Sequence, residues 1–263
     1  MLTEEEKERY SRQILLREIG VAGQEKLKNA KILVIGAGGL GSPAAMYLAA
    51  AGVGTLGICD GDTVDRSNLQ RQLLHSTGRL GQKKTLSAQS ILADINPDIQ
   101  IVTHDCFAGP ENIRQIIENY DFVLDCTDSF DSKFLINDAC VLAGKPFCHA
   151  GVLQFSGQLM TWLPGRGLPC YRCVFREVPP PTPAADKGVL GAAVGAVGCL
   201  QAMEAVKFIT GAGMPIAGAL LTFDALEGDF RQIALPKAAH DCPVCNASNE
   251  AAMACFSSPT AKS

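Results

Sequence analysis

A short apolar run, Lys31–Ile35, passes directly into a turn that spells G-A-G-G-L-G. Gly36, Gly38 and Gly41 give this turn the spacing G-x-G-x-x-G, and small helix-forming residues fill positions 42–51 behind it. A strand, a glycine turn and a helix in this order point backbone N–H groups and a helix N-terminus at one place, where they can hold a phosphate group. The pattern therefore predicts a parallel α/β sheet with a nucleotide at the end of its first strand.

Alternating strand and helix patterns continue along the chain. A second apolar run, Thr55–Cys59, closes at Asp60, 19 residues after Gly41, where a carboxylate can hydrogen-bond a ribose hydroxyl. Further strands are predicted at 99–104, 122–126 and 146–150, with helices at 83–95, 111–119 and 131–143. Beyond residue 151, strands at 157–163, 218–223 and 230–235 flank one long helix at 189–210. We expect a Rossmann-like, mostly parallel sheet with helices on both faces and an antiparallel extension.

These patterns predict four regions. Residues 1–28 form an N-terminal helical segment, for which Thr3 and Glu6 supply a capping box. Residues 29–163 form the Rossmann-like nucleotide-binding core, and residues 164–247 form an extension pinned by a metal. We expect a mobile loop at 177–187, where four prolines stand in eleven residues, and a disordered tail at 248–263.

Composition and charge argue against two classes of partner. The chain of 263 residues is 47% hydrophobic and 19% charged, which suits a globular protein with a buried core. Its 23 basic and 27 acidic residues give a net charge of −4, so we expect no nucleic-acid partner. The most apolar stretch, 189–210, contains Gln201, Glu204 and Lys207, and the N-terminus lacks an apolar signal segment. We therefore expect no membrane partner and a cytoplasmic protein.

Cationic and acidic residues follow the predicted strands. The segment S-N-L-Q-R-Q at 67–72 comes after the second strand, and Lys84 opens the next helix. Arginine presents a planar fork to phosphate oxygens and lysine a compact charge, so Arg71 and Lys84 favour a triphosphate over a hydride carrier. Asp128 ends the fourth strand at the carboxyl edge of the sheet, where a carboxylate facing a triphosphate indicates Mg²⁺. Taken alone, Arg71 could be a surface residue and Asp128 a helix cap.

Two pairs of cysteines stand apart from the rest. Of eleven cysteines, four form two C-x-x-C units, Cys170 with Cys173 and Cys242 with Cys245. Four thiolates can surround one tetrahedral Zn²⁺, and they leave no coordination position for a water molecule. We therefore expect a structural zinc site, although each C-x-x-C unit by itself could be a redox pair. The four histidines, including His149 at the end of a predicted strand, receive no role.

Taken together and in order, these motifs resemble the ThiF/MoeB/HesA family, the bacterial relatives of ubiquitin-activating enzymes. The resemblance covers about residues 9–245. It rests on R-Y-S-R-Q at 9–13, the glycine turn, S-N-L-Q-R-Q at 67–72, Lys84, L-D-C-T-D at 124–128 and the paired cysteines. It implies an adenylyltransferase that uses MgATP to adenylate the C-terminal Gly-Gly carboxylate of a small ubiquitin-like sulfur-carrier protein and releases pyrophosphate.

The resemblance also implies roles for individual residues. The catalytic residues would be Arg12, Arg71, Lys84 and Asp128. The nucleotide-binding set would be Gly36, Gly38, Gly39, Gly41, Asp60, Ser67, Asn68, Arg71, Lys84, Asp128 and Ser129. Within it, Gly39 would contact the nucleotide, Asp60 the ribose and Asp128 the Mg²⁺. Arg12 would reach into the site of a neighbouring subunit, which implies a homodimer.

Two departures from the family pattern bear on the reaction. Sulfur-transferring members carry a cysteine four residues before a G-V-L-G motif, where this chain has Ala184. Many members have asparagine at the position of Ser129. The chain ends at Ser263 without a rhodanese extension, so the resemblance implies an external sulfur donor.

Several alternatives stay open at this point. The chain could adenylate another peptide terminus, or it could be an NAD(P)-dependent Rossmann oxidoreductase or a nucleotide-sensing scaffold without catalysis. If a sulfur carrier is the substrate, its pathway could lead to molybdopterin, thiamine or a related product.

Overall fold

The computed structural model describes residues 1–177 and 188–246. The N-terminal segment folds into α1 (Glu4–Arg9), α2 (Ser11–Ile14) and α3 (Gly20–Asn29). Strands and helices then alternate as β1 (Lys31–Ile35), α4 (Gly41–Ala50), β2 (Thr55–Cys59), α5 (Lys84–Ile95), β3 (Gln100–His104), α6 (Ile113–Ile117), β4 (Phe122–Asp125), α7 (Phe130–Leu142) and β5 (Phe147–Leu153). They are followed by β6 (Ser156–Trp162), α8 (Tyr171–Val174), α9 (Gly191–Thr210), β7 (Ala219–Asp224) and β8 (Asp229–Ala234).

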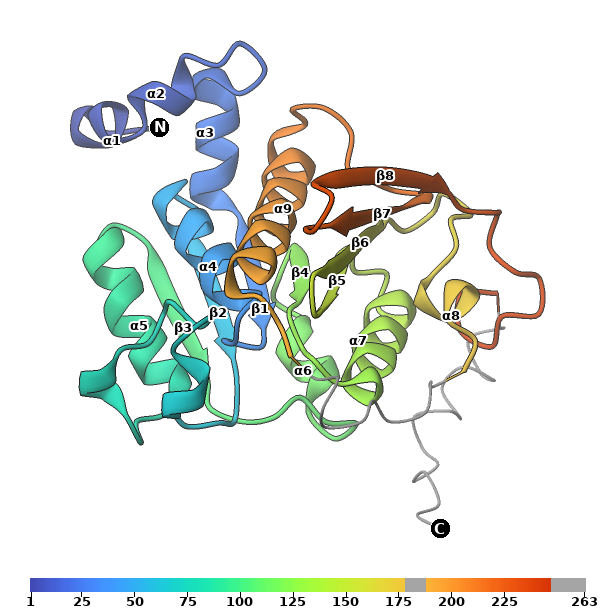
Figure 1. Cartoon of the computed structure of the whole chain (residues 1–263). Helices are drawn as coiled ribbons and strands as arrows, with labels where there is room; N and C mark the ends of the chain where they lie inside the picture. The colour runs from blue at the N-terminus through green and yellow to red at the C-terminus, as the bar shows by residue number, and fades with distance from the viewer. Residues whose placement is uncertain (178–187, 247–263) are drawn as a thin grey trace.

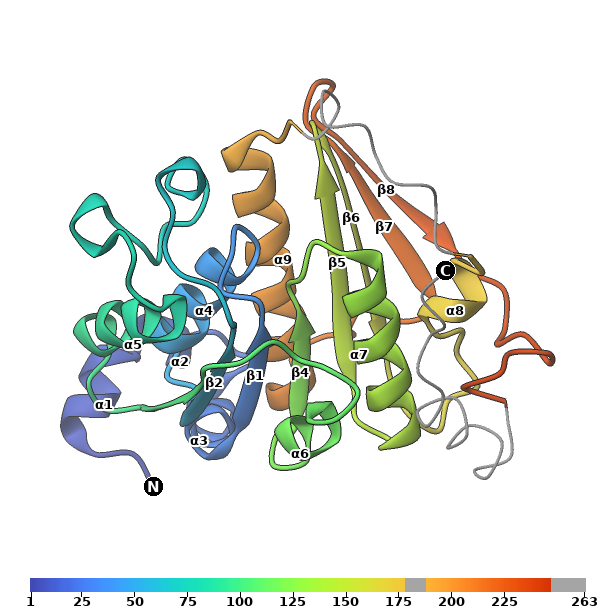
Figure 2. The same ribbon diagram turned by 90° about the horizontal axis from the view of Figure 1, so that it is seen from below.

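In the described part of the chain, eight strands form one sheet in the order β3-β2-β1-β4-β5-β6-β7-β8 (Figures 1 and 2). The first five strands in this order, β3, β2, β1, β4 and β5, pair in parallel. Strands β6, β7 and β8 then join them in antiparallel pairs. Ile35 is level with Cys59 of β2 and with Asp125 of β4, so the residues that follow these strands meet at one edge. The predicted mostly parallel sheet with an antiparallel extension is confirmed.

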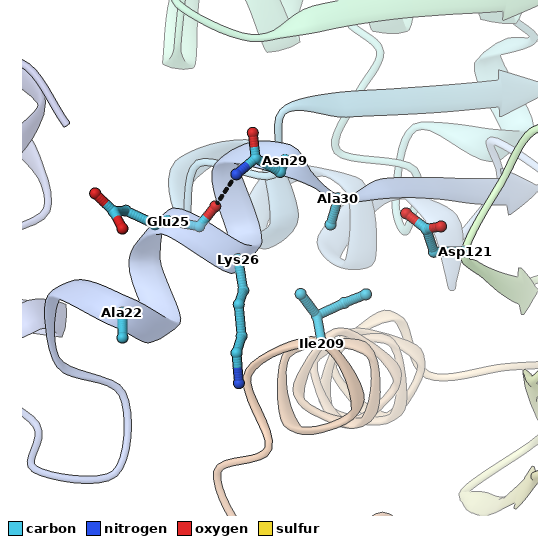
Figure 3. A pocket seen from close by; sticks show the side chains of 7 residues that line it. All are labelled: Ala22, Glu25, Lys26, Asn29, Ala30, Asp121 and Ile209. Atoms are coloured by element: carbon cyan, nitrogen blue, oxygen red, sulfur yellow. Dashed lines mark hydrogen bonds between the residues drawn. The ribbon is translucent and has the colours of Figure 1, made fainter. Parts of the chain in front are cut away.

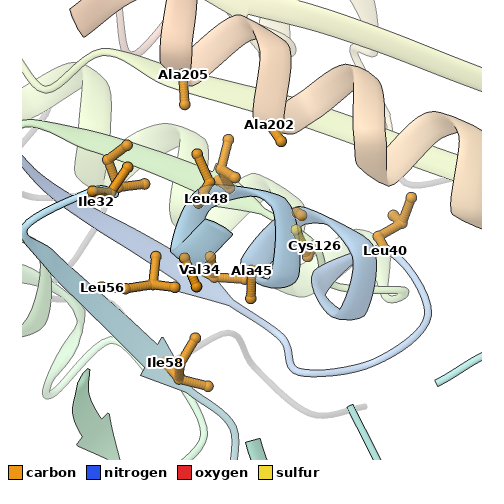
Figure 4. Close-up of a cluster of buried hydrophobic side chains, with 14 of the residues drawn as sticks. Ile32, Val34, Leu40, Ala45, Leu48, Leu56, Ile58, Cys126, Ala202 and Ala205 are labelled. Carbon is orange, nitrogen blue, oxygen red and sulfur yellow. The ribbon is translucent and has the colours of Figure 1, made fainter. Parts of the chain in front are cut away.

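Alternate residues of the inner strands face two separate core layers. Ile32 and Val34 of β1 pack with residues of α4, α5 and α9, such as Leu48 (Figure 4). Leu33 and Ile35 point to the other face and pack with residues of α6 and α7. Because helices cover both faces, β1 is buried on both sides, which explains its unbroken apolar sequence.

The structure differs from the sequence-based prediction after β4. Strand β5 runs to Leu153, beyond the expected end at residue 150, because it forms a hairpin with β6 in which Leu153 pairs with Ser156. The single-turn helix α8 was not predicted, and it begins directly after the first cysteine of the first C-x-x-C unit. Four residues carry too little periodicity to indicate such a turn.

Helix α9 is the one helix among the described residues that is long and apolar enough to cross a membrane, by length and composition only. Here it packs on the sheet, and Val197 and Ala205 belong to the core. Its polar residues Gln201 and Glu204 are buried too, and they hydrogen-bond the carbonyl oxygen of Asp125 (2.9 Å) and the hydroxyl of Thr161 (2.6 Å). Its polar groups are therefore satisfied within the fold.

Two expectations fall on residues that the structure leaves undescribed. The expected mobile loop at 177–187, apart from Glu177, and with it Ala184, lies outside the described residues. The expected disordered tail at 248–263 lies outside them as well. The division of the chain into four regions stays a prediction.

Candidate functional site

The glycine turn between β1 and α4 is shaped by close backbone contacts. A Cβ atom on Gly41 would lie 1.9 Å from the carbonyl oxygen of Gly36, and one on Gly36 would lie 2.7 Å from that of Cys126. Gly36 also has a φ of +98°, a conformation that favours glycine. A Cβ on Gly39 would lie 2.7 Å from a methyl group of Val194 in α9, whereas Gly38 has only ordinary contacts. The turn therefore packs against the end of β4 and against α9.

Asp60 is fixed beside this turn at the end of β2. One oxygen of its carboxylate accepts the N–H of Ala37 at 2.8 Å, and the other accepts the N–H of Asp62 at 2.8 Å. Each oxygen keeps a free lone pair, so the carboxylate can still accept a hydrogen bond from a hydroxyl group. The structure thus brings Asp60 to the glycine turn.

Lys84 is the first residue of α5, and its side chain is buried with an acidic partner. Its Nζ donates to Oδ2 of Asp62 at 2.9 Å, and the residue is only 4% exposed. The Asp62 side chain is 54% exposed. A phosphate could therefore replace Asp62 at Nζ without leaving that carboxylate buried and unpaired. Sequence reasoning missed Asp62, because no spacing rule relates it to Lys84.

Arg71 lies against the outside of the glycine turn. A Cβ on Gly39 would lie 3.4 Å from Cγ of Arg71, and the guanidinium donates to the carbonyl oxygen of Ser67 at 3.2 Å. Ser67 and Asn68 belong to the short 3-10 helix η1 (Arg66–Asn68), where the Ser67 hydroxyl donates to Asp65 at 2.6 Å. Arg71 and Gln72 of the segment at 67–72 therefore lie against the glycine turn, whereas the Ser67 proton is already used by Asp65.

His75 holds the glycine turn to α5, and no sequence pattern indicated this role. Its Nε2 donates to the carbonyl oxygen of Ala37 at 2.9 Å, and its Nδ1 lies 2.9 Å from the hydroxyl of Ser87. Burial lowers the pKa of His75 below its usual range, so the ring is neutral at pH 7. A second 3-10 helix, η2 (Thr77–Arg79), follows it in the loop before α5.

Asp128 follows β4, and Ser129 caps the next helix. The Ser129 hydroxyl accepts the N–H of Ser132 at 3.2 Å at the start of α7, so the capping role considered for Asp128 is filled by its neighbour. Asp128 itself is exposed, and its carboxylate has no partner within 1–177 and 188–246. Its oxygens are thus available to a cation.

Three buried polar side chains are in contact at the end of β4, close in sequence to Asp128. Asp125 Oδ2 accepts Nδ1–H of His149 at 2.8 Å and lies 3.5 Å from Nζ of Lys133. Burial by itself raises the pKa of Asp125, but the charge of Lys133 and the bond from His149 outweigh it and lower that pKa to about 2. Burial, helped by Lys133, lowers the pKa of His149 to about 4, so the ring is neutral at pH 7. Sequence reasoning named His149 but gave it no role.

Arg12 is not brought to this site. It is exposed on α2, whose next residue, Gln13, hydrogen-bonds the carbonyl oxygen of Ala51 at 3.2 Å. Ala51 lies at the C-terminal end of α4 and the glycine turn at its N-terminal end, so α2 sits at the end of that helix opposite to the turn.

The amino edge of the sheet carries the hollow drawn in Figure 3, between α3 and the end of α9. The residues lining that hollow are Ala22, Glu25, Lys26, Asn29, Ala30, Asp121 and Ile209.

The two C-x-x-C units converge at one point. Sγ of Cys170 lies 3.9 Å from that of Cys173 and 3.7 Å from that of Cys242, and Cys173 and Cys245 are 3.5 Å apart. All four sulfur atoms lie within 4.8 Å of one another. A tetrahedron with metal–sulfur bonds of about 2.3 Å has edges of about 3.8 Å. The four cysteines therefore form a cluster that could bind a metal ion.

The comparisons with known proteins agree with these features. The family model described as "ThiF family" matches residues 10–244. The chain is 47% identical to "Adenylyltransferase and sulfurtransferase MOCS3" of Drosophila sechellia over 94% of its length, and 48% identical to that of Bos taurus over 93%. These alignments cover 55% and 54% of the relatives, so the chain spans about half the length of the curated relatives it matches.

Solved structures share the fold. The structure of MccB from E. coli with ATP superposes with a TM-score of 0.80 at 24% identity, covering 91% of this chain and 75% of that chain. The structure of MccB from E. coli gives a TM-score of 0.82 at 23% identity over 92% and 73%. With the family model matched over most of the chain and curated relatives near 47% identity, the chain belongs to the ThiF family.

Proposed function

We propose that the protein is an adenylyltransferase that uses ATP to activate the C-terminal Gly-Gly carboxylate of a ubiquitin-like sulfur-carrier protein. One observation carries this proposal: Asp60 and Arg71 contact the glycine turn, where a helix N-terminus can hold a phosphate. Lys84 pairs with Asp62 in the loop after β2, and Asp128 follows β4, which ends at the same edge of the sheet. Relatives near 47% identity bear the name adenylyltransferase, which supports the same reaction class.

The reaction joins two anions, so the protein must neutralise and align them. The carrier carboxylate attacks the α-phosphorus of ATP, a new P–O bond forms, and the bond to the bridging oxygen breaks to release pyrophosphate. The carboxylate is already ionised at pH 7, so no general base is required. Arg71 and Lys84 would stabilise charge on the phosphate oxygens, and Asp60 would hold the ribose.

Two metal ions fit residues of this chain. The exposed, unpartnered carboxylate of Asp128 suits Mg²⁺, which when bound neutralises charge on phosphate oxygens. The four convergent thiols suit Zn²⁺, and four sulfur ligands leave no position for water. We propose a structural role for that site, which ties the segment after β6 to the segment after β8.

The proposal is tested by ATP–pyrophosphate exchange with a small carrier protein that ends in Gly-Gly. We expect exchange only with the intact carrier and none with a carrier that lacks its last two glycines. Exchange with unrelated peptides would favour another peptide terminus as substrate. Oxidation of NAD(P)H would favour an oxidoreductase, and ATP binding without exchange a scaffold. Affinity capture from native extract, followed by mass identification of bound Gly-Gly proteins, would identify the pathway.

The proposed homodimer gives Arg12 a role in the partner's site. Arg12→Ala and Lys84→Ala should each lose exchange, because each breaks one half of a composite site. An equal mixture of the two variants should regain about a quarter of wild-type activity, since half of the dimers are mixed and one of their two sites is intact. Differently tagged copies would verify subunit exchange. No recovery despite proven exchange would contradict the shared site.

Sulfur transfer is proposed to occur outside this chain. Ala184 has no thiol, so the loop position used by sulfur-transferring members cannot form a persulfide or attack an acyl-adenylate. We propose that the enzyme passes the carrier adenylate to an external sulfur donor. A reductant-sensitive bond between enzyme and carrier, mapped to a cysteine of this chain, would overturn this part of the proposal. The cytoplasmic location stays a prediction.

A further inference from the structure

The turn that carries Asp128 is held by a buried network of hydrogen-bonded polar side chains. Asp125 is 1% exposed, and its Oδ1 accepts both the N–H of Thr127 at 3.1 Å and the hydroxyl of Thr127 at 2.7 Å. Nζ of Lys133 donates to the carbonyl oxygen of Thr127 at 2.6 Å and to that of Ala150 at 2.7 Å. The residue before Asp128 is therefore fixed at its N–H, its C=O and its side chain.

His149 supplies the short hydrogen bond that completes this network. Asp125 is ionised, so Nδ1 of His149 carries the proton and donates it to Oδ2 at 2.8 Å. The only other group near Oδ2 in the described network is Nζ of Lys133, at 3.5 Å. Without His149, Oδ2 would be left with that long contact. Lys133 would then move towards Asp125 and release the carbonyl oxygens that it holds, because a buried carboxylate is costly to leave unpaired.

The His149 ring also packs against a residue of the first C-x-x-C unit. The ring of Tyr171 lies 4.4 Å from that of His149, and Tyr171 stands between Cys170 and Cys173. The N–H of Tyr171 also donates to Oδ1 of Asn137 in α7 at 2.8 Å. The next residue, Arg172, forms a bidentate pair with Asp138 of α7 at 2.7 and 2.6 Å. The first C-x-x-C unit thus packs on both His149 and α7.

We propose that His149 is a positioning residue, which sets the place of Asp128 through Asp125 and Thr127, and that Tyr171 couples the cysteine cluster to this turn. The effect on nucleotide chemistry rests on the proposed function, whereas the effect on the turn does not. His149 touches no substrate in this scheme. It acts by holding a carboxylate that in turn holds the backbone next to the cation-binding residue.

The test compares His149→Phe with His149→Asn. Phenylalanine keeps a ring against Tyr171 but has no donor, and asparagine keeps a donor near the position of Nδ1 but has no ring. Hydrogen–deuterium exchange followed by mass spectrometry would measure protection of the 124–129 peptide without any nucleotide. We expect at least tenfold faster exchange of this peptide in His149→Phe and near wild-type exchange in His149→Asn. Equal protection in all three proteins would overturn the proposal.

A second readout connects the turn to the cation. Calorimetric titration of ATP at several Mg²⁺ concentrations gives the Mg²⁺ concentration for half-maximal tightening of ATP binding. We expect this concentration to rise about tenfold in His149→Phe and to return close to the wild-type value in His149→Asn. A lower melting temperature in His149→Phe with an unchanged Mg²⁺ requirement and unchanged peptide protection would show a merely structural role. If wild-type protein binds no ATP, the proposed function fails, and peptide exchange still decides the role of His149.

A further pair of variants serves if His149→Phe does not fold. Thr127→Val removes the hydroxyl that Asp125 accepts and keeps the shape of the side chain, and Thr127→Ser keeps the hydroxyl. We expect faster exchange of the 124–129 peptide in Thr127→Val than in Thr127→Ser. Identical exchange in these two variants would contradict the network as the support of Asp128.

Discussion

Lys84→Ala should lower carrier-dependent ATP–pyrophosphate exchange by about two to three orders of magnitude, while the far-ultraviolet circular dichroism spectrum stays unchanged. The Lys84 side chain is buried, with Asp62 as its acidic partner, and Asp62 in turn bonds Asp60 beside the glycine turn. A buried cation that is already in place before negative charge develops on the phosphate stabilises the transition state far more than an exposed cation does. The reason is that little reorganisation is needed during the reaction. Arg71→Ala should also reduce exchange, since its side chain lies against Gly39.

Two variants beside Lys84 act as controls. Lys83→Ala removes an equal charge one residue away, from a side chain that is 45% exposed and pairs with Asp105 at 3.5 Å. This variant should retain exchange within about threefold of wild type, because exposed ion pairs contribute little. Asp62→Asn removes the competing carboxylate and keeps a hydrogen-bond acceptor, so it should not lower the affinity for ATP. Near-normal exchange in a folded Lys84→Ala protein would contradict the phosphate role.

The sequence predicted most of the sheet because the relevant signals are local. Strands β1 and β2 begin and end where the apolar runs do, since strands buried on both faces must be apolar throughout. The glycine turn was predicted for the same reason, and Gly36 and Gly41 are needed for backbone contacts within or next to the turn. The two C-x-x-C units could be assigned to one site although they are 72 residues apart, because four thiols in two such units suit one metal ion.

The residues that support the site could not be predicted in the same way. His75 contacts Ala37 across 38 positions, and His149 contacts Asp125 across 24. Asp125 and His149 are paired on the parallel strands β4 and β5, and His75 reaches Ala37 from the loop before α5. No periodic pattern in one segment records a partner in another. Asp62 is missed because it takes Lys84 as partner only when the loop after β2 folds back on α5. The predicted role of Arg12 involves a second copy of the chain, because α2 lies at the end of α4 opposite to the glycine turn.

Cys170→Ser should remove the metal and lower the free energy of unfolding by more than about 4 kcal/mol, because binding energy at a structural site contributes directly to folding. Metal analysis should give about one zinc per wild-type chain and almost none per variant chain. In wild-type protein, four thiols should resist alkylation until a chelator is added. Cys199→Ser is the matched control, since Cys199 is a half-buried cysteine of α9 outside the cluster and should change neither metal content nor melting temperature strongly.

The loss of metal should also weaken the contacts that the first C-x-x-C unit makes with α7. Tyr171 and Arg172 stand between two of the four cysteines, and they bind Asn137 and Asp138 of that helix. Without a metal, the first C-x-x-C unit loses its connection to Cys242 and Cys245, so these contacts are held less firmly. Peptides of α7 should therefore exchange deuterium faster in Cys170→Ser than in Cys199→Ser. Zinc retained by a Cys170→Ser/Cys242→Ser double variant would contradict the assignment, because two of the four proposed ligands would then be dispensable.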